Sequence, residues 1–315
     1  MGQMIEITIT ENQKRLDSAL AKILSEKGFT RSKIQRLILE KRILLNGREP
    51  KSSDFVRLGD KVEVKLEEEK KNEILPLDFP LKVWYEDEYL FVVEKPSGMV
   101  THPSYGHYSD TLVNVLLSLK IPLSTFQGKE RAGIVHRLDK ETSGLLVVAK
   151  DEKTHQFLSK QFAERKVYKE YLALVWGSLP KDEIEVIASL KRDTKNRKKI
   201  GVDKTGKEAK TLFIAVDNLK FISLVRAIPK TGRTHQIRVH LSHIKHPIVG
   251  DFIYGGHLEN GIPYDKLRKF IKECGRFFLH ASKIVFENIN GKKIEVVSPI
   301  PKDFVQLMEI VKNYG

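Results

Sequence analysis

Several features that define large protein classes are scarce or absent in this 315-residue chain. Its single cysteine, Cys274, excludes an internal disulfide or a cysteine zinc cage and fits a reducing compartment. No stretch approaches the roughly 18 uncharged apolar residues that a membrane-spanning helix needs. Residues 1–13 hold acidic and polar side chains where a signal peptide has its apolar segment. We therefore expect a cytoplasmic protein with no membrane partner.

Glycine-rich phosphate loops are absent as well: the chain contains neither a GxGxxG nor a Walker motif, and no internal repeat is visible. Hydrophobic residues nevertheless make up 41% of the chain, which is enough for a core and excludes a wholly disordered chain. At roughly 150 residues per domain, the length allows one large domain or two unequal ones.

Positive charge is what the chain has in excess. Lysine and arginine number 55 and aspartate and glutamate 41, a formal net charge of +14. Such a surplus favours a polyanionic partner, either nucleic acid or an acidic membrane surface. A heat-tolerant source would explain many charges of both signs but not the imbalance. The charge therefore favours a nucleic acid as the partner.

Residues 14–66 have the pattern of a small compact unit. The apolar residues of a first predicted helix fall on one face: Leu16, Leu20, Ile23 and Leu24. Thr30 is a candidate N-cap for a second helix. A strand is expected at 43–45, followed by a tight turn at Asn46-Gly47, and a half-buried strand with alternating apolar and charged residues over 62–66.

Basic side chains gather on the second predicted helix and the adjoining hairpin: Arg31, Lys33, Arg36, Arg42, Arg48 and Lys51. A solvated charged face is the plain alternative, but their concentration on these two elements favours contact with an RNA backbone. The segment resembles the small αL-type RNA-binding domain first known from ribosomal protein four of the small subunit. This resemblance implies a small α/β-hairpin RNA-binding domain over residues 1–66.

A charged segment without apolar residues, EEEKKNE at 67–73, and two prolines after it predict a linker over residues 67–80. Residues 81–315 are rich in strands with interspersed helices. Because strands and helices do not alternate regularly, we predict an α+β domain with a mixed, largely antiparallel sheet rather than a doubly wound one. Residues 191–210 carry nine Lys or Arg and three acidic residues and predict a basic exposed loop.

The segment AGIVHRLDKETSGLLVVAK, residues 132–150, places polar side chains between two apolar runs. The runs predict a strand on each side of a turn that exposes His136, Arg137, Asp139 and Thr142. Rigid strands that flank a polar turn are a common way to position an active site. An ordinary salt-bridged turn is the alternative.

A second polar cluster is expected on a helix over residues 233–244, where Thr234, Arg238 and Leu241 would share one face. An arginine that lines a cleft needs a carboxylate, and Asp139 is the candidate partner. Four histidines lie within residues 230–251, His235, His240, His243 and His246, but their spacing matches no zinc motif and no carboxylate stands among them. We therefore expect no metal site here.

These motifs identify a family. HRLDKETSGLLVVAK, KEYLALVWG and GRTHQIRVHL, with PIVGD after them and VVEKPSGMVTHP before them, closely resemble the RluA/RluC/RluD group of pseudouridine synthases. The motifs occur in the family's order and cover about residues 80–255. The resemblance implies the pseudouridine synthase fold and an enzyme that converts selected uridines of RNA, most often large-subunit ribosomal RNA, to pseudouridine.

The resemblance also implies site residues. By its place in HRLD, Asp139 corresponds to the essential aspartate, and by its place in HQIR, Arg238 corresponds to the arginine that pairs with it. Tyr171, in KEY, matches the active-site tyrosine; a tyrosine packed in the core is the alternative. A carboxylate suits this chemistry, because cleaving a glycosidic bond builds positive charge on the ribose carbon that a carboxylate can stabilise or trap.

Three further residues are expected to bind the substrate. Arg137 matches an arginine that can occupy the space left by a flipped uridine, and His136 and Thr142 are expected to shape the same loop. The resemblance implies neither a cofactor nor a metal, and we expect a monomer. Two alternatives remain open: a non-enzymatic RNA-binding or ribosome-assembly factor, and a hydrolase that uses His136 and Asp139.

Overall fold

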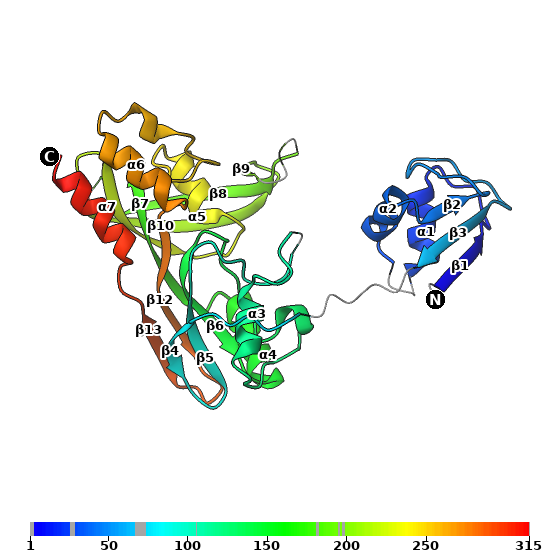
Figure 1. Cartoon of the computed structure of the whole chain (residues 1–315), viewed down its shortest axis with the longest axis horizontal. Helices are drawn as coiled ribbons and strands as arrows, with labels where there is room; N and C mark the ends of the chain where they lie inside the picture. The colour runs from blue at the N-terminus through cyan, green and yellow to red at the C-terminus, as the bar shows by residue number, and fades with distance from the viewer. Residues whose placement is uncertain are drawn as a thin grey trace. The chain divides into compact units, whose positions relative to one another are not determined.

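The computed structural model describes residues 3–25, 29–66, 74–104, 106–180, 183–194, 196 and 199–314. The chain forms two compact units, Met1–Glu73 and Ile74–Gly315 (Figure 1). Among the described residues, no helix has the length and apolar character required to span a membrane.

The smaller unit packs two helices against a three-stranded sheet. Its described elements are β1 Gln3–Thr8, α1 Leu16–Ile23, α2 Arg31–Leu39, β2 Ile43–Leu45 and β3 Lys61–Leu66. The sheet order is β1-β3-β2 and both pairings are antiparallel. The two helices and the β2 and β3 strands confirm the sequence prediction. Strand β1 was not predicted, although Ile5 and Ile7 alternate with polar residues along it and pack against the core.

Local interactions explain where these elements begin and end. The Thr30 hydroxyl accepts a hydrogen bond from the Lys33 backbone amide at 3.3 Å, which confirms Thr30 as the N-cap of α2. Asn46 and Gly47 have positive φ values of 50° and 77°, as a tight hairpin turn of this kind requires. Ile23 departs from the predicted inner face of α1: it is 42% exposed, because it is the last residue of the helix.

The predicted linker, residues 67–80, divides into two parts. Residues 67–73 lie outside the described residues. Residues 74–80 pack along the larger unit, where Ile74, Leu77 and Phe79 contact its hydrophobic core. Asn114 fixes this segment, since its side-chain amide donates to the Leu75 carbonyl at 2.7 Å and its own carbonyl accepts from the Leu77 amide at 2.9 Å.

The larger unit is built on one extended sheet. Its described strands are β4 Lys82–Glu86, β5 Leu90–Lys95, β6 Ser143–Ala149, β7 Tyr168–Trp176, β8 Ile184–Arg192, β9 Ile200–Val202, β10 Lys207–Asn218, β11 Ile222–Pro229, β12 Leu279–Glu287 and β13 Lys293–Val297. Its described helices are α3 Leu112–Ser118, α4 Glu152–Ala163, α5 Gln236–His243, α6 Asp265–Cys274 and α7 Lys302–Lys312, with 3-10 turns at Lys129–Arg131 and Leu258–Gly261.

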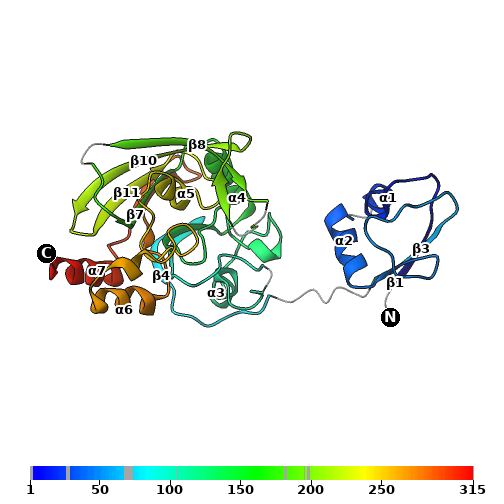
Figure 2. The same cartoon turned by 90° about the horizontal axis from the view of Figure 1, so that it is seen from above.

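The strand order is β4-β5-β6-β12-β7-β11-β10-β8-β9, with β13 attached to β12. The described pairings are antiparallel except for the short parallel contact between β6 and β12. Helices α6 and α7 lie side by side in both views (Figures 1 and 2). The predicted α+β class with a mixed, largely antiparallel sheet is confirmed.

Strand β6 is buried along its whole length because hydrophobic cores lie on both of its faces. Leu146 and Val148 join the core that contains α3, and Leu145 and Val147 join the core that receives Leu158 of α4. A strand covered on both sides gives a rigid support to the loop that precedes it. That loop carries Asp139.

Three sequence predictions in this unit were wrong in detail. Residues 132–135 do not form a strand; only Ile134 makes an isolated bridge, to Val148. The basic stretch 191–210 is not one loop, since it contains β9 and the start of β10. Helix α5 begins at Gln236, after His235 in a left-handed conformation, so Thr234 lies outside the helix.

Candidate active site

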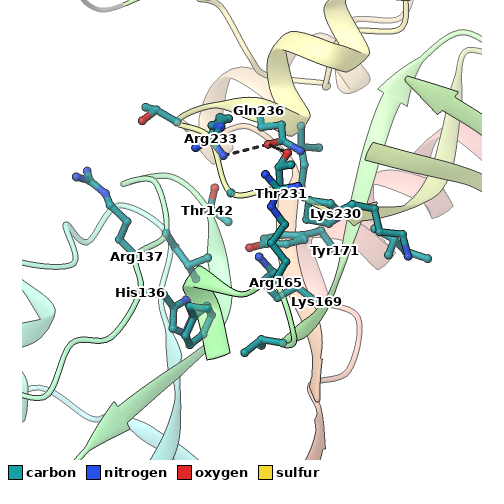
Figure 3. Close-up of a pocket in the computed structure, with 18 of the residues that line it drawn as sticks. His136, Arg137, Thr142, Arg165, Lys169, Tyr171, Lys230, Thr231, Arg233 and Gln236 are labelled. Atoms are coloured by element: carbon teal, nitrogen blue, oxygen red, sulfur yellow. Dashed lines mark hydrogen bonds between the residues drawn. The ribbon is translucent and has the colours of Figure 1, made fainter. Parts of the chain in front are cut away.

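A cleft of about 700 Å³ opens in the larger unit between the loop that precedes β6 and the connection from β11 to α5. The start of β7 and the end of α4 complete its wall (Figure 3). Cations line it from several elements: Arg137, Arg165, Lys166, Lys169, Lys230, Arg233 and Arg238. The cleft thus brings together Asp139, Tyr171 and Arg238, which lie far apart in the sequence, and it also contains His136, Arg137 and Thr142.

A buried arginine joins two carboxylates in this cleft. The Arg238 Nη1 donates to Asp139 Oδ2 at 3.1 Å, while Nε and Nη2 donate to the two oxygens of Asp251 at 2.7 and 3.0 Å. The side chains of Arg238 and Asp251 are 4% and 1% exposed, whereas that of Asp139 is 22% exposed. Asp139 is therefore the carboxylate that faces the open cleft. The predicted pairing of Arg238 with Asp139 is present, but Asp251 holds the arginine more extensively.

The surroundings keep Arg238 charged. Burial works against the guanidinium, but the hydrogen bonds and charge of Asp251, with the charge of Asp139, outweigh it and raise the pKa of Arg238. Its guanidinium carbon also lies 4.9 Å from the ring centre of Tyr254 and 4.2 Å from that of Phe277. Arg238 is thus a fixed positive charge at the base of the cleft.

Backbone geometry places Asp139 in front of that charge. The Thr142 amide donates to the Asp139 carbonyl at 3.1 Å and closes a turn that leads into β6. Gly144 has φ +114° and lies so close to β12 that a Cβ would stand 2.3 Å from the Ala281 carbonyl oxygen. Only glycine permits that approach, which lets β6 begin directly after the turn. Gly144 is the glycine of the TSG motif.

The fully buried Lys95 stabilises the same turn through hydrogen bonds to backbone carbonyls. Its ammonium donates to the carbonyls of Pro96, Met99 and Lys140 at 2.8, 2.8 and 3.0 Å. Burial lowers the pKa of Lys95 to about 7. The sequence analysis placed Lys95 in a family motif, VVEKPSG, but gave it no role; it ties the strand β5 to the residue that follows Asp139.

Tyr171 lies on β7 and lines the cleft opposite this loop. It is paired with Ala227 of β11 and Ala281 of β12, and its side chain is partly buried against two hydrophobic cores of the unit, as the core-packing alternative expects, while it also lines the cleft. In Figure 3 its phenol extends from β7 toward the side that carries His136 and Arg137. Burial, with the negative charge of Asp139, raises the pKa of Tyr171, so its hydroxyl stays protonated near neutral pH.

The three predicted substrate-binding residues differ in their surroundings. His136 Nε2 accepts the Val147 amide at 2.9 Å, and its ring stacks on Phe162 with centroids 4.4 Å apart. Burial lowers its pKa to about 3. Because that lone pair is already engaged, Nε2 is not available as a general base, which argues against the hydrolase alternative.

Arg137 is exposed on the rim of the cleft, and in Figure 3 its guanidinium extends away from the other labelled residues. Thr142 is not exposed as predicted but 2% exposed, because it is the residue at which the turn enters β6. Its Oγ1 is buried without a hydrogen-bond partner in the described structure.

Sequence reasoning missed two residues near Asp139. His235, weighed only as a metal ligand, places Nε2 3.8 Å from Asp139 Oδ2. Asp251 lies in PIVGD, a motif noted for the resemblance without a role. Helical spacing could not find either, because His235 precedes α5 and Asp251 follows it in a separate turn.

Among the described residues no group of three His, Cys, Asp or Glu side chains is arranged to hold a metal ion.

The basic residues predicted to contact RNA lie in the smaller unit, on and after α2: Arg31, Lys33, Arg36, Arg42, Arg48 and Lys51. Arg31 donates to the buried carboxylate of Asp17 at 3.1 Å and so helps to hold α1 against α2. Arg48 and Lys51 are exposed in the segment between β2 and β3.

The chain is similar to known proteins at the level of family, sequence and structure. Residues 89–243 match the family model described as RNA pseudouridylate synthase. The chain is 37% identical over 314 residues to an uncharacterized RNA pseudouridine synthase, YlyB, of Bacillus subtilis, covering 99% of each chain. It is 36% identical over 321 residues to the ribosomal large subunit pseudouridine synthase D of Escherichia coli K12, covering 99% of this chain and 96% of that one. The solved structure of human RNA pseudouridylate synthase domain containing 1 has a TM-score of 0.56 and 25% identity, covering 70% of this chain and 83% of that one.

Proposed function

Because the chain belongs to the RNA pseudouridylate synthase family, we propose that it isomerises uridines of large-subunit ribosomal RNA with Asp139 as the reacting carboxylate. The observation that carries the assignment of Asp139 is its exposure to a cation-lined cleft while it is bound to the buried Arg238. The relatives named ribosomal large subunit pseudouridine synthase D support ribosomal RNA as the substrate.

The reaction is an isomerisation, so its atoms balance within the substrate. The bond from ribose carbon 1′ to the ring nitrogen breaks, and a bond from that carbon to ring carbon five forms. The proton on carbon five leaves, and the ring nitrogen gains one. No electron acceptor is needed, and the chain must supply a carboxylate and a route for one proton.

Asp139 supplies the carboxylate that the reaction needs. An ionised carboxylate stabilises or traps the positive charge that builds at carbon 1′ when the glycosidic bond breaks. At about 3 Å and an effective dielectric constant of about 20, a full positive charge attracts it by roughly 5 kcal/mol before desolvation is counted. Arg238 supplies that charge and also fixes the direction of one carboxylate oxygen, Oδ2.

Tyr171 is suited both to transfer the proton and to bind the base. Its ring lines the cleft and supplies an aromatic surface on which a flipped uracil can stack. Its hydroxyl is protonated near neutral pH, so it acts first as a proton donor. Thr142 lines the cleft, but its Oγ1 is buried, so we propose that it shapes the loop around the base.

Binding of RNA precedes this chemistry, and the target uridine must leave its stack at a cost of a few kcal/mol. The exposed Arg137 at the rim suits occupation of the vacated space. We assign residues 1–66 as the RNA-binding domain and residues 74–315 as the catalytic domain, so that the connection shortens from the predicted 67–80 to 67–73. Exposed cations such as Arg48 and Lys51 are suited to contact the phosphate backbone of the RNA.

The test is a map of pseudouridine in transcribed large-subunit ribosomal RNA after incubation with the protein, read by carbodiimide modification. Asp139→Asn is compared with Asp78→Asn, an exposed acid outside the cleft. We expect new sites with the unmutated chain and with Asp78→Asn and none with Asp139→Asn. If naked RNA stays unmodified, the same comparison is made on assembling subunits. Silence there as well would reject the proposal in favour of a non-enzymatic RNA-binding or assembly factor.

A further inference from the structure

His235 stands beside the reacting carboxylate in a conformation that costs stability. It is a non-glycine residue with φ +55° and ψ 17°, in the left-handed region, directly before α5. Such a conformation is unfavourable for a residue with a Cβ, and glycine or asparagine is the usual choice there. The His235 side chain does not cap the helix either. The His235 carbonyl accepts the Val239 amide at 2.9 Å, so the backbone supports the helix while the ring is left for another purpose.

The position of the ring proton follows from the hydrogen bonds around Tyr254. The Tyr254 hydroxyl oxygen accepts the Ile200 backbone amide at 2.9 Å and lies 2.8 Å from His235 Nδ1. If Nδ1 carried the proton, the phenol hydrogen would have no acceptor among the described residues. The phenol therefore donates to Nδ1, and the single proton of the neutral imidazole is on Nε2.

That Nε2–H group faces Asp139. The distance from Nε2 to Asp139 Oδ2 is 3.8 Å, slightly too long for a hydrogen bond in the unliganded cleft. Active-site hydrogen bonds of this kind commonly shorten when substrate fills the site. Oδ2 is also the oxygen that accepts from Arg238 Nη1, so both donors approach one oxygen, and no described side chain donates to Oδ1.

The charges around Asp139 explain why a neutral histidine suits this position. Burial lowers the pKa of His235, and the positive charge of Arg238 opposes the effect of Asp139, so the ring is neutral at neutral pH. A neutral donor fixes the direction of the carboxylate without adding a second cation beside Arg238. A second full charge would weaken the carboxylate as a nucleophile or electrostatic partner for carbon 1′.

Resting on the proposed function, we propose that His235 is a positioning residue for Asp139: its Nε2–H, held in that tautomer by Tyr254, fixes Oδ2 and directs Oδ1 at the ribose. Tyr254 also places its ring 4.9 Å from the Arg238 guanidinium, so one side chain sets both donors to Asp139. The Tyr254 hydroxyl also accepts the backbone amide of Ile200, the first residue of β9, so β9 helps to hold Tyr254 in place.

The test uses His235→Gly in the full chain, because glycine fits the left-handed backbone while removing the ring. We expect the single-turnover rate of pseudouridine formation on transcribed large-subunit ribosomal RNA to fall between about tenfold and a hundredfold. RNA affinity should change less than threefold, and the midpoint of thermal unfolding should stay within a few degrees or rise. Lys245→Gly is the matched control, since Lys245 has φ +70° at the other end of α5 and is exposed outside the cleft. Its rate should be unchanged.

Two more variants separate positioning from packing. His235→Gln retains a side-chain N–H donor and should recover a substantial part of the rate lost in His235→Gly. Tyr254→Phe keeps the ring on Arg238 but loses the hydroxyl; it should slow the reaction about threefold to tenfold, yet add nothing in the His235→Gly background.

The inference is overturned if His235→Gly reacts within threefold of the unmutated chain, or if its loss is matched by an equal loss of RNA affinity or of folding. Multiplicative losses in the double variant would overturn the link to Tyr254. An unmutated chain without activity, or an active Asp139→Asn, would instead reject the proposed function, and the inference with it.

Discussion

The two carboxylates on Arg238 are expected to separate stability from catalysis. Asp251 makes two hydrogen bonds to the arginine with a side chain that is 1% exposed, whereas Asp139 makes one and is 22% exposed. Asp251 also accepts the backbone amides of Ile253 and Tyr254 at 3.2 and 3.3 Å. Substitution of Asp251 therefore removes the main counter-charge of a buried cation, and substitution of Asp139 does not.

The size of the effect follows from burial. Removing one partner of a buried ion pair costs about 3–5 kcal/mol, and Asp139 offsets a part of this for Asp251→Asn. Taking about 3 kcal/mol, and about 2–4 °C per kcal/mol for a unit of this size, the unfolding midpoint of the larger unit should fall by roughly 6–12 °C. For Asp139→Asn, a partly exposed group, we expect a change below about 1 kcal/mol, or roughly 3 °C, together with complete loss of pseudouridine formation.

Thermal unfolding by calorimetry and carbodiimide mapping of the product measure the two quantities on the same samples. Arg238→Met/Asp251→Leu is an informative control, because replacing a buried ion pair with apolar residues is often neutral for stability. That double variant should unfold at a temperature well above that of Asp251→Asn and yet be inactive. A midpoint for Asp251→Asn within 3 °C of the unmutated chain, or an equal fall for Asp139→Asn, would refute this assignment of roles.

Three further predictions concern the tyrosine, the buried histidines and the basic surface. Tyr171→Phe should lower the single-turnover rate at least a hundredfold, because it removes a proton donor but keeps the stacking face, while RNA affinity measured by filter binding stays within threefold; a rate near that of the unmutated chain would leave Tyr171 only a packing role. Burial lowers the pKa of His136 and of His280 to about 3, below the ordinary value near 6.5, so the unfolded chain binds more protons between these values. The contribution of these two histidines to stability should hence be constant above about pH 6.5 and be lost as the pH drops toward 3, and a flat unfolding midpoint between pH 6.5 and 4 would contradict this. Arg48→Glu with Lys51→Glu should weaken RNA binding and reduce the slope of log affinity against log salt by about 1 to 2, whereas an unchanged slope would show that the smaller unit does not neutralise phosphates there.

Elements with a strong local signal were predictable from the sequence. Thr30 as a helix cap and the Asn46-Gly47 turn depend on contacts within a few residues, so short-range chemistry was sufficient to place them. Strand β6 follows from a continuous apolar run, which its burial on both faces explains. The failed strand at 132–135 has a similar apolar run, but Gly133 with φ +72° makes it turn instead.

The family motifs led to Asp139, Tyr171 and Arg238 through resemblance, and the structure brings all three to one cleft. What the sequence could not supply was the order of strands that produces the cleft. Strand β12, which pairs with both β6 and β7, joins segments more than a hundred residues apart. No periodicity within a segment encodes a pairing between segments so distant from one another.

The same limit explains why Asp251 and His235 were missed. A helical repeat identifies residues that share a face of α5, yet both residues lie beyond its ends and reach Arg238 or Asp139 through turns. Gly250, before Asp251, has φ +78° and is so close to the Arg276 carbonyl that a Cβ would stand 2.2 Å from it. A glycine that only the packed structure requires thus positions the carboxylate that holds Arg238. The arginine's strongest partner is consequently set by tertiary packing, and a substitution of Gly250 should disturb Arg238 without altering any residue that touches the substrate.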